Sequence, residues 1–406
     1  MTPTPLLGAA REFLLSLFLS RLADQVLLFL VPLVVFQSTG SIAWSGLAFA
    51  AEAFPRFLSF PICGALCDRV SPLRLVRVSQ LYRALVCVLG AGASAAFGGV
   101  GWLIALSAAC GVLTTQGAMA REVLLPQVFK AYRFEKVLAY SQATDQAGAV
   151  LGPVVAAALL GWWRWEVVVC LAAAGFLLAD AAMTLWSRTN RASLIEPEAA
   201  VSWTRSMKTT LSHVVYLPGL RRLVILAAGV NLVLGATLAS SAALVTGLHR
   251  QSAGYYAGLQ TAGAIATIVV LLAIAHSALP PRRMGALAFA LILLGGILTA
   301  TGQNHWVYGV GFLLIVGFDK MFNIYIRSSR QKIIPPGDYG KTIGVIVLLN
   351  NLTQPLAGLT IALCSGFATT GTILLALTAL MGLLGAMAAM TDSPHAAVTV
   401  REPRQS

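Results

Sequence analysis

Charge is scarce in this sequence of 406 residues: Asp, Glu, Lys and Arg make up 11% of the chain, and 58% is hydrophobic. An average soluble domain is about 25% charged. A soluble globule of this length needs far more polar surface than these residues supply. The composition excludes an ordinary soluble protein and predicts that most of the chain lies in a lipid bilayer.

Signatures of enzymes and of ATP-driven machines are also missing. The sequence contains no GxxxxGK[ST] phosphate-binding motif, which argues against ATP as the energy source. Its five histidines are scattered, without a paired nucleophile or metal-ligand spacing. We therefore predict that the protein is not an enzyme and holds no cofactor and no metal.

The cysteines and the basic residues exclude two further classes of protein. All six cysteines lie in apolar runs, without the pattern of a secreted disulfide framework. The net charge is +13, but no basic run is interleaved with aromatic residues, so nucleic acid is not a predicted partner. The N-terminal stretch lacks a basic region followed by a cleavage site, so we expect the first apolar run to be kept as a helix.

Apolar runs separated by turns and charges predict twelve membrane-spanning helices, each about 20 residues or longer. Lys and Arg cluster in alternate connections, whereas the other connections carry only Arg164 and Arg250. The positive-inside rule then predicts cytoplasmic N- and C-termini in an inner (plasma) membrane. The helices are expected to begin near Glu12, Ile42, Leu75, Val100, Lys136, Glu166, Pro218, Gly254, Arg282, His305, Lys341 and Thr369.

A long polar connection divides the helices into two sets of six. We predict an N-terminal bundle over 1–186, a cytoplasmic linker over 187–217, a C-terminal bundle over 218–392 and a cytoplasmic tail over 393–406. The halves share a local pattern, in which Arg121 and the following Leu-Leu-Pro match Arg330 and the following Ile-Ile-Pro. Such a repeat predicts duplicated bundles with a cavity at their interface.

The most specific motif is GALCDRVSPLR, which begins at Gly64 and includes Asp68, Arg69 and Arg74. It resembles the GxLxDRxxxxR signature of the major facilitator superfamily, in the same loop between the second and third helices. The glycine permits close helix approach, and the acid and bases can latch the two bundles on the cytoplasmic side. The resemblance implies the twelve-helix fold of that superfamily.

The fifth predicted helix carries a second motif, formed by Gly148, Gly152 and Pro153. It resembles the GxxxGP motif of antiporters in the superfamily. Small residues permit close packing and the proline can bend the helix where the bundles meet, which suits a gate. In the tenth helix Arg327 and Arg330 are expected to belong to an inner-gate charge cluster.

Over nearly its whole length the chain is similar to the third drug:proton antiporter family, which includes macrolide-efflux and siderophore-export proteins. The similarity rests on RLAD at 21–24, FPR at 54–56 with Gly64, the pair Gln116 and Gly117, and PPGDYGK at 335–341. It implies an exporter driven by protons.

Charged groups inside helices are the candidates for proton coupling, because an ionised group at bilayer depth needs a partner, water or a function. The spacing pairs Arg21 with Asp24 and Glu52 with Arg56 on single helix faces. Asp180 either titrates or pairs with Arg83. The coupling candidates are Asp24, Glu52, Asp145 and Asp319. For Asp145 a gate hydrogen-bond network is the alternative role, and for Asp319, next to Lys320, the alternatives are an inner-gate charge cluster and substrate binding.

The superfamily resemblance implies a substrate cavity lined by helices one, four, seven and ten. Amides, hydroxyls and aromatic rings in these helices suit an uncharged or zwitterionic amphiphile. The substrate-cavity candidates are Arg21, Arg56, Gln116, Asn231, Phe318, Asn323 and Tyr325.

Together these patterns predict a monomeric secondary transporter that exports a siderophore or drug-like molecule by alternating access, in exchange for protons. Two alternatives use the same fold. One is an importer of a metal chelate or nutrient, and the other is a metal carrier similar to ferroportin.

Overall fold

The computed structural model describes residues 6–39, 42–99, 101–190, 212–213, 217–364 and 367–390. Within these ranges the chain is helical and has no strand. Twelve long helices form the fold: α1 (Leu6–Thr39), α2 (Ile42–Cys67), α3 (Pro72–Phe97), α4 (Gly101–Val128), α5 (Phe134–Leu160), α6 (Trp165–Thr189), α8 (Pro218–Ala242), α9 (Ala253–His276), α10 (Pro281–Thr301), α11 (His305–Ile333), α12 (Tyr339–Cys364) and α13 (Thr370–Met390).

Local sequence sets many of these helix ends. Pro72, Pro218 and Pro281 occupy the first turn of α3, α8 and α10, where proline needs no hydrogen-bond acceptor. Ser252 and Asn304 cap α9 and α11 with their side-chain oxygens. The predicted helix starts lie within three residues of the observed ones in every case except α1.

Helix α1 begins six residues before the predicted Glu12, at Leu6. Leu6 and Ala10 are buried in the largest apolar core of the described residues. This first turn is therefore held by packing, even though charged residues interrupt the apolar run. A six-residue π-helix, Ala243–Leu248, also extends α8, and the sequence pattern gives no sign of it.

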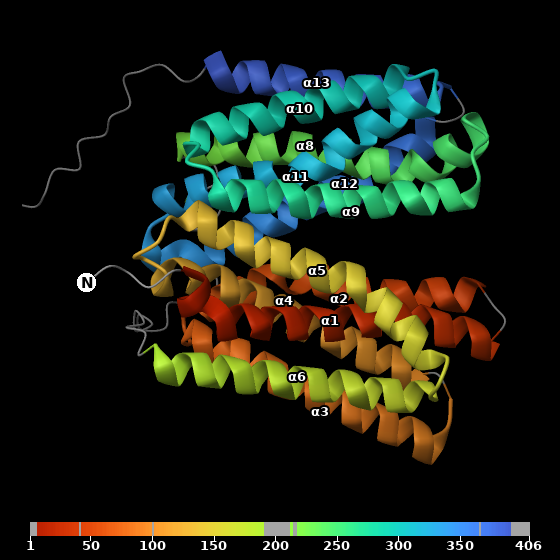
Figure 1. Cartoon of the computed structure of the whole chain (residues 1–406), viewed down its shortest axis with the longest axis vertical. Helices are drawn as coiled ribbons and strands as arrows, with labels where there is room; N and C mark the ends of the chain where they lie inside the picture. Colours follow the sequence, from red (N-terminus) through yellow and green to blue (C-terminus); the bar gives the residue numbers. More distant parts are fainter. Residues whose placement is uncertain are drawn as a thin grey trace, which may run out of the picture.

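The helices form two bundles, α1–α6 and α8–α13, stacked side by side in Figure 1. In the first bundle α1 packs on α5 and α6, and α2 packs on α4. In the second, α8 packs on α12 and α13, and α10 packs on α11. Contacts between the bundles are made chiefly by α2 with α12 and by α5 with α9.

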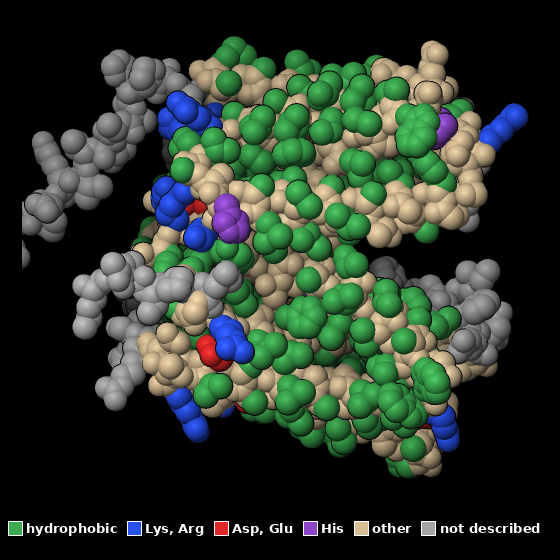
Figure 2. Space-filling model, viewed as in Figure 1, with side chains coloured by type: hydrophobic (Ala, Val, Ile, Leu, Met, Phe, Trp, Pro, Cys, Tyr) green, Lys and Arg blue, Asp and Glu red, His purple; other side chains and the backbone are tan. Residues whose placement is uncertain are grey.

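Apolar side chains cover the middle of both bundles, and Lys and Arg gather toward one end of the molecule (Figure 2). We call this end, which carries the turns α2–α3, α4–α5, α9–α10 and α11–α12, the basic end. Eleven of the described helices are long and apolar enough to cross a membrane, and α2 adds an apolar stretch from Pro55 to Cys67. The prediction of an all-α integral membrane protein with twelve helices in two bundles is confirmed.

The two bundles meet most closely near the basic end, where α2 crosses α12. A Cβ added to Gly64 would lie 2.4 Å from the carbonyl oxygen of Gly340, and one added to Gly344 would lie 2.5 Å from that of Phe60. Such distances mean that the two backbones touch, which only glycine permits. At the opposite end, the surface is hollowed between the bundles (Figure 2).

Candidate functional site

A cavity of about 340 Å³ lies where the first bundle faces α11. Five helices of the first bundle and one helix of the second contribute to its wall. The side chains that line it are Phe13, Leu17, Ser20, Arg21, Asp24, Val76, Ser79, Gln80, Arg83, Thr114, Gly117, Ala118, Arg121, Gln142, Asp145, Gln146, Met183, Lys320 and Arg327. Its volume is in the range of sites that bind small organic molecules.

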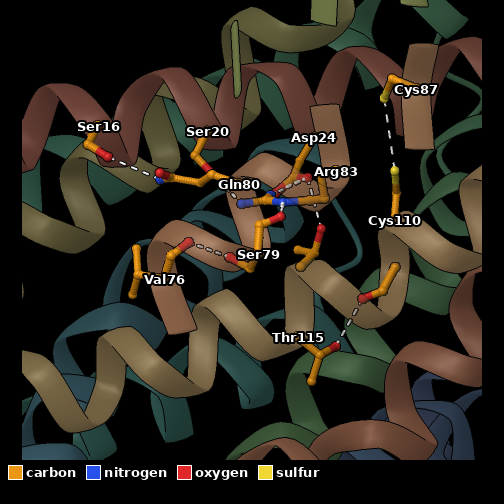
Figure 3. A network of polar contacts seen from close by, with 12 residues as sticks. Ser16, Ser20, Asp24, Val76, Ser79, Gln80, Arg83, Cys87, Cys110 and Thr115 are labelled. Atoms are coloured by element: carbon orange, nitrogen blue, oxygen red, sulfur yellow. Dashed lines mark hydrogen bonds and ion pairs between the residues drawn. The ribbon is translucent and has the colours of Figure 1, made fainter. Parts of the chain in front are cut away.

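An ion pair between Asp24 of α1 and Arg83 of α3 lies in the wall of this cavity (Figure 3). Nη1 of Arg83 donates to both carboxylate oxygens, at 2.8 and 2.9 Å, and the hydroxyl of Thr114 donates to Oδ1 at 2.8 Å. Nη2 of Arg83 donates to Ser20 at 2.9 Å, and the guanidinium lies 4.4 Å from the ring centre of Phe176. Both charges are buried and have partners, as burial demands.

Two predicted pairings are therefore wrong. Asp24 was expected to pair with Arg21 three residues earlier, but its partner is Arg83. Asp180, expected to titrate or pair with Arg83, pairs with Arg77 at 3.0 Å. Helical spacing compares only residues of one helix, whereas these partners come from neighbouring helices. The signal for the true partner of Asp24 was Arg83, a charged residue within the apolar run of the third helix.

Arg121 and Asp145 form a second ion pair on the cavity wall, with Nη1 2.7 Å from Oδ1. An arginine followed by Leu-Leu-Pro is typical of the end of a helix, but Arg121 lies inside α4, which continues to Val128. The Leu-Leu-Pro after Arg121 made its place inside a helix hard to predict, because proline usually marks a helix boundary. Asp145, a predicted coupling residue, does line the cavity.

The second bundle contributes Lys320 and Arg327 to the wall. Lys320 pairs with the buried carboxylate of Asp319 at 2.7 Å. Arg327 pairs with Glu122 of α4, and Arg330 pairs with the same carboxylate. The predicted charge cluster of Arg327 and Arg330 thus exists, and its acidic partner, which the sequence analysis missed, comes from the other bundle.

A latch at the basic end joins the bundles through Asp68. Its two carboxylate oxygens accept hydrogen bonds from the backbone N–H groups of Gly340 and Lys341, each at 2.8 Å. Burial raises the pKa of Asp68 to about 6, although those N–H groups and the Lys341 ammonium act to lower it and Asp338 adds to the rise. The predicted latch thus includes Asp68, but its partners are backbone groups of the second bundle.

Other contacts close the same end. Arg133 donates to the carbonyl oxygens of Ser277 and Leu279, at 2.8 and 3.0 Å. Glu135 accepts a hydrogen bond from the hydroxyl of Ser328. Arg69 lies in the turn after α2 and Arg74 is exposed on the first turn of α3, so both predicted gate residues are at this end.

Gly148 and Gly152 of the predicted GxxxGP gate face α1, within the first bundle. A Cβ on Gly148 would lie 3.0 Å from Cβ of Arg21, and one on Gly152 would lie 2.3 Å from Cβ of Gln25. Pro153 follows inside α5. The glycines therefore fix the packing of α5 on α1 and do not lie at the contact between the bundles.

Two of the predicted substrate residues bond to neighbouring helices and do not line the cavity. Gln116 is buried and donates to Sγ of Cys67 at 3.6 Å. Asn231 of α8, the seventh predicted helix, donates to the carbonyl oxygen of Asn350 at 3.3 Å.

The three candidates from the tenth predicted helix, α11, are also absent from the wall. Tyr325 lies against Gly285 of α10. Asn323 donates to the carboxylate of Asp319 at 3.2 Å, and Phe318 packs against the apolar core.

The remaining candidates for the substrate cavity and for proton coupling are Arg21, Arg56 and Glu52. Arg21 lines the cavity. Arg56 and Asp24 line a second, much smaller cavity of about 10 Å³. The side chain of Glu52, predicted to pair with Arg56, lies outside the described residues.

Known structures with this fold include several transporters. The chain is similar to the human organic anion transporter MFSD10 (TETRAN), with TM-score 0.74, 17% identity, and coverage of 95% of this chain and 100% of that one. It is also similar to a bacterial homologue of the iron transporter ferroportin in an outward-facing state (TM-score 0.71, 16% identity, 94% and 99% coverage). A third similar structure is FucP in the outward conformation (TM-score 0.70, 14% identity, 94% and 99% coverage).

No match was found among curated protein sequences. The sequence model of the Major Facilitator Superfamily matches residues 13–358, which is most of the chain. With the twelve-helix fold and a cavity between two bundles already in place, this match identifies the chain as a membrane transporter of the Major Facilitator Superfamily.

Proposed function

We propose that this transporter exports a small organic molecule, of siderophore or drug-like kind, across the inner membrane in exchange for protons. One observation carries the proposal: a carboxylate, Asp24, lies on the wall of a cavity of about 340 Å³ between bundles that are latched together at one end. A cavity closed at one end is one of the two states that alternating access requires. The similarity to the third drug:proton antiporter family supports export.

The orientation follows from charge. Lys and Arg are concentrated at the end where both bundles are latched, and the positive-inside rule places that end in the cytoplasm. Both termini would then be cytoplasmic, and the structure would be open toward the outside. Export from this state requires the latch to open so that the cavity faces the cytoplasm.

Coupling would act through the ion pair of Asp24 and Arg83. A proton on Asp24 removes the negative charge that holds Arg83, and a bound substrate favours the same release if it competes for the guanidinium. The pair of Arg121 and Asp145, on the same wall, offers a second protonation site.

A metal carrier is less well supported. The described residues contain no group of three or more His, Cys, Asp or Glu side chains able to hold a metal ion. Asp24 is bonded to Arg83 and Thr114, so a cation would have to displace a guanidinium to reach it. Import of a chelate or nutrient remains the opposite direction of the same cycle.

Proton flux in proteoliposomes tests the proposal. Purified protein is reconstituted with an internal pH dye, and siderophores, macrolides and metal ions are added in turn. We expect one class of organic solute to move protons against its own direction, and Asp24→Asn to abolish the proton movement. Asp180→Asn is the matched control, because that carboxylate pairs with Arg77 away from the cavity.

Other results would remove parts of the proposal. Solute flux without proton movement would exclude proton coupling. Protons that move in the same direction as the solute would make the protein an importer. Proton movement driven by a bare metal ion, and lost in Asp24→Asn, would favour the metal carrier.

A further inference from the structure

The cavity carries more positive than negative charge. The charged side chains on its wall and their ion-pair partners are six bases and four acids: Arg21, Arg83, Arg121, Lys320, Arg327 and Arg330 against Asp24, Asp145, Asp319 and Glu122. Each acid is already paired with at least one base. Low-dielectric walls strengthen the field that such an excess creates inside a cleft.

Arg21 is the one base of this set that forms no ion pair with any of these acids. It lines the cavity, and within the described ranges it makes no hydrogen bond or ion pair; its Nε is buried without a partner. Arg21 as a whole is only partly buried, but a charged donor with a buried and unpartnered Nε costs stability unless a group in the cavity pairs with it.

The packing of α1 on α5 directs Arg21 toward the cavity. The absent side chain of Gly148 leaves room for Cβ and Cγ of Arg21, which lie 3.0 and 3.1 Å from where a Cβ of residue 148 would be. The stem of Arg21 therefore lies against α5, and Arg21 is part of the cavity wall.

Other residues of the cavity wall also carry buried hydrogen-bond donors without partners. Nε of Arg121 and Nε2 of Gln142 are buried without partners, and both side chains line the cavity. Gln80 adds one unpartnered acceptor, its Oε1. Buried polar groups in proteins normally have partners, so three donors from α1, α4 and α5 point to a ligand rich in acceptors.

From these observations we infer that the cavity binds a small organic anion, whose carboxylate or similar acidic group is held by Arg21, with Arg121, Gln142 and Lys320 as further donors. This inference rests on the proposed function, because it names the charge class of the transported solute. It replaces the uncharged or zwitterionic amphiphile that the amides and hydroxyls of the sequence predict. Lys320 belongs to the second bundle, so the anion would contact both bundles.

The electrostatic preference of the cavity can be measured without knowing the ligand. Ala118 lines the wall from α4 and Gln146 lines it from α5, and each is replaced in turn by cysteine. The background carries Cys170→Ser and Cys364→Ser, because the other four native cysteines are buried. Full-length protein in lipid nanodiscs is treated with an anionic sulfonatoethyl or a cationic trimethylammonioethyl methanethiosulfonate, and mass spectrometry gives both rates.

We expect the ratio of anionic to cationic rates to exceed that of a free small thiol by about tenfold, given the field of the excess charge. Arg21→Gln should lower this ratio by about fivefold, since removing a unit charge at contact range affects the two reagents in opposite senses. Arg188→Gln, at an exposed arginine near the end of α6, should leave the ratio unchanged.

A preference for the cationic reagent, an equal loss in Arg21→Gln and Arg188→Gln, or no reaction of either reporter with the anionic reagent would overturn the inference. These outcomes are separable from those of the proton-flux assay. An anion-selective cavity without proton-coupled flux would keep the inference and remove the proposed function. Coupled flux of a cation that is indifferent to Arg21→Gln would do the reverse.

Discussion

The two bundles share an architecture but use their buried polar side chains differently. In the first bundle these groups pair across helices, as Asp24 does with Arg83 and Arg77 does with Asp180. In the second they are mostly hydroxyls that bond to their own helix: Ser240 donates to Ala236, and Thr378 to Leu374. Most of the cavity wall and its ion pairs thus belong to the first bundle, and the second bundle contributes only α11 to that wall.

This difference has a physical cost and a benefit. Hydroxyls that bond to their own helix leave few bonds across helix contacts to resist sliding, although Thr267 of α9 also donates to Val316 of α11. Ion pairs between helices resist such sliding and hold charges in fixed positions. This difference suits a transporter in which the first bundle holds the charged binding groups and the second bundle rocks against it.

Removing a cross-helix charge should produce the largest effect. Arg83→Met leaves Asp24 buried without its guanidinium, and we expect a loss of stability of about 3–5 kcal/mol. In the second bundle Thr267→Val removes hydroxyl bonds to Gly263 and Val316 and should cost about 1 kcal/mol. Thermal unfolding midpoints of the two detergent-purified variants compare them.

The double variant Arg83→Met with Asp24→Leu serves as the control for that experiment, since it removes both charges together. Most of the lost stability should return. Equal midpoints for Arg83→Met and Thr267→Val would contradict the contrast between the bundles.

An intermediate effect is expected where an acid of the first bundle meets bases of the second. Glu122→Gln leaves Arg327 and Arg330 facing each other without their shared carboxylate. Hydrogen bonds to charged groups contribute about 1.5–3 kcal/mol, so the population with an open basic end should rise by about tenfold or more. Distances between spin labels at exposed Lys130→Cys and Arg282→Cys, in the background that lacks Cys170 and Cys364, report the opening.

Glu166→Gln is the matched change at the opposite end, where that acid pairs with the exposed Arg164. It should leave the label distances as they are. An identical response of the two variants would show that Glu122 does not hold the bundles together.

The smallest effect should come from pH acting on Asp68. Its pKa is about 6 in the latched state, whereas in an open state water would return it to its ordinary lower value. The latched state therefore holds the proton more tightly: its extra stability is full below the ordinary pKa and is lost as the pH rises through 6. Lowering the pH from 7 to 5 should raise the ratio of latched to open protein by about tenfold.

The same label pair measures this ratio, and Asp68→Asn should remove the dependence on pH. A ratio that falls on acidification would contradict the assignment. Asp338, which faces Asp68 and raises its pKa, would be the next residue to replace.

Much of the fold could be predicted from the sequence because membrane helices must be long, apolar and separated by turns. The latch at Asp68 could also be predicted, since Gly64 and the charged residues after it form a specific motif. Lys and Arg placement identified the basic end. These features depend on position along the chain, which a sequence shows directly.

The rotation of each helix about its axis was not predictable. In a membrane protein the lipid-facing and the core-facing sides are both apolar, so hydropathy does not reveal which side points inward. Asn231 and Tyr325 were expected at the cavity because the superfamily resemblance assigns their helices to it, but they face Asn350 and Gly285. Arg83 was known to lie in a helix, yet its partner depended on how α3 turns toward α1.

The backbone contact of Gly64 with Gly340 also has a mechanical meaning. It lies near one end of α2, which has 26 residues and is therefore about 39 Å long. If the part of α2 from Gly64 back to Ile42, about 33 Å long, moved as a rigid rod, pivoting at the contact by about ten degrees would displace the far tip by about 6 Å. Gly64 and Gly340 would then work as the fulcrum of a lever, and a side chain in either place would shift the pivot point and alter how wide the distant mouth can open.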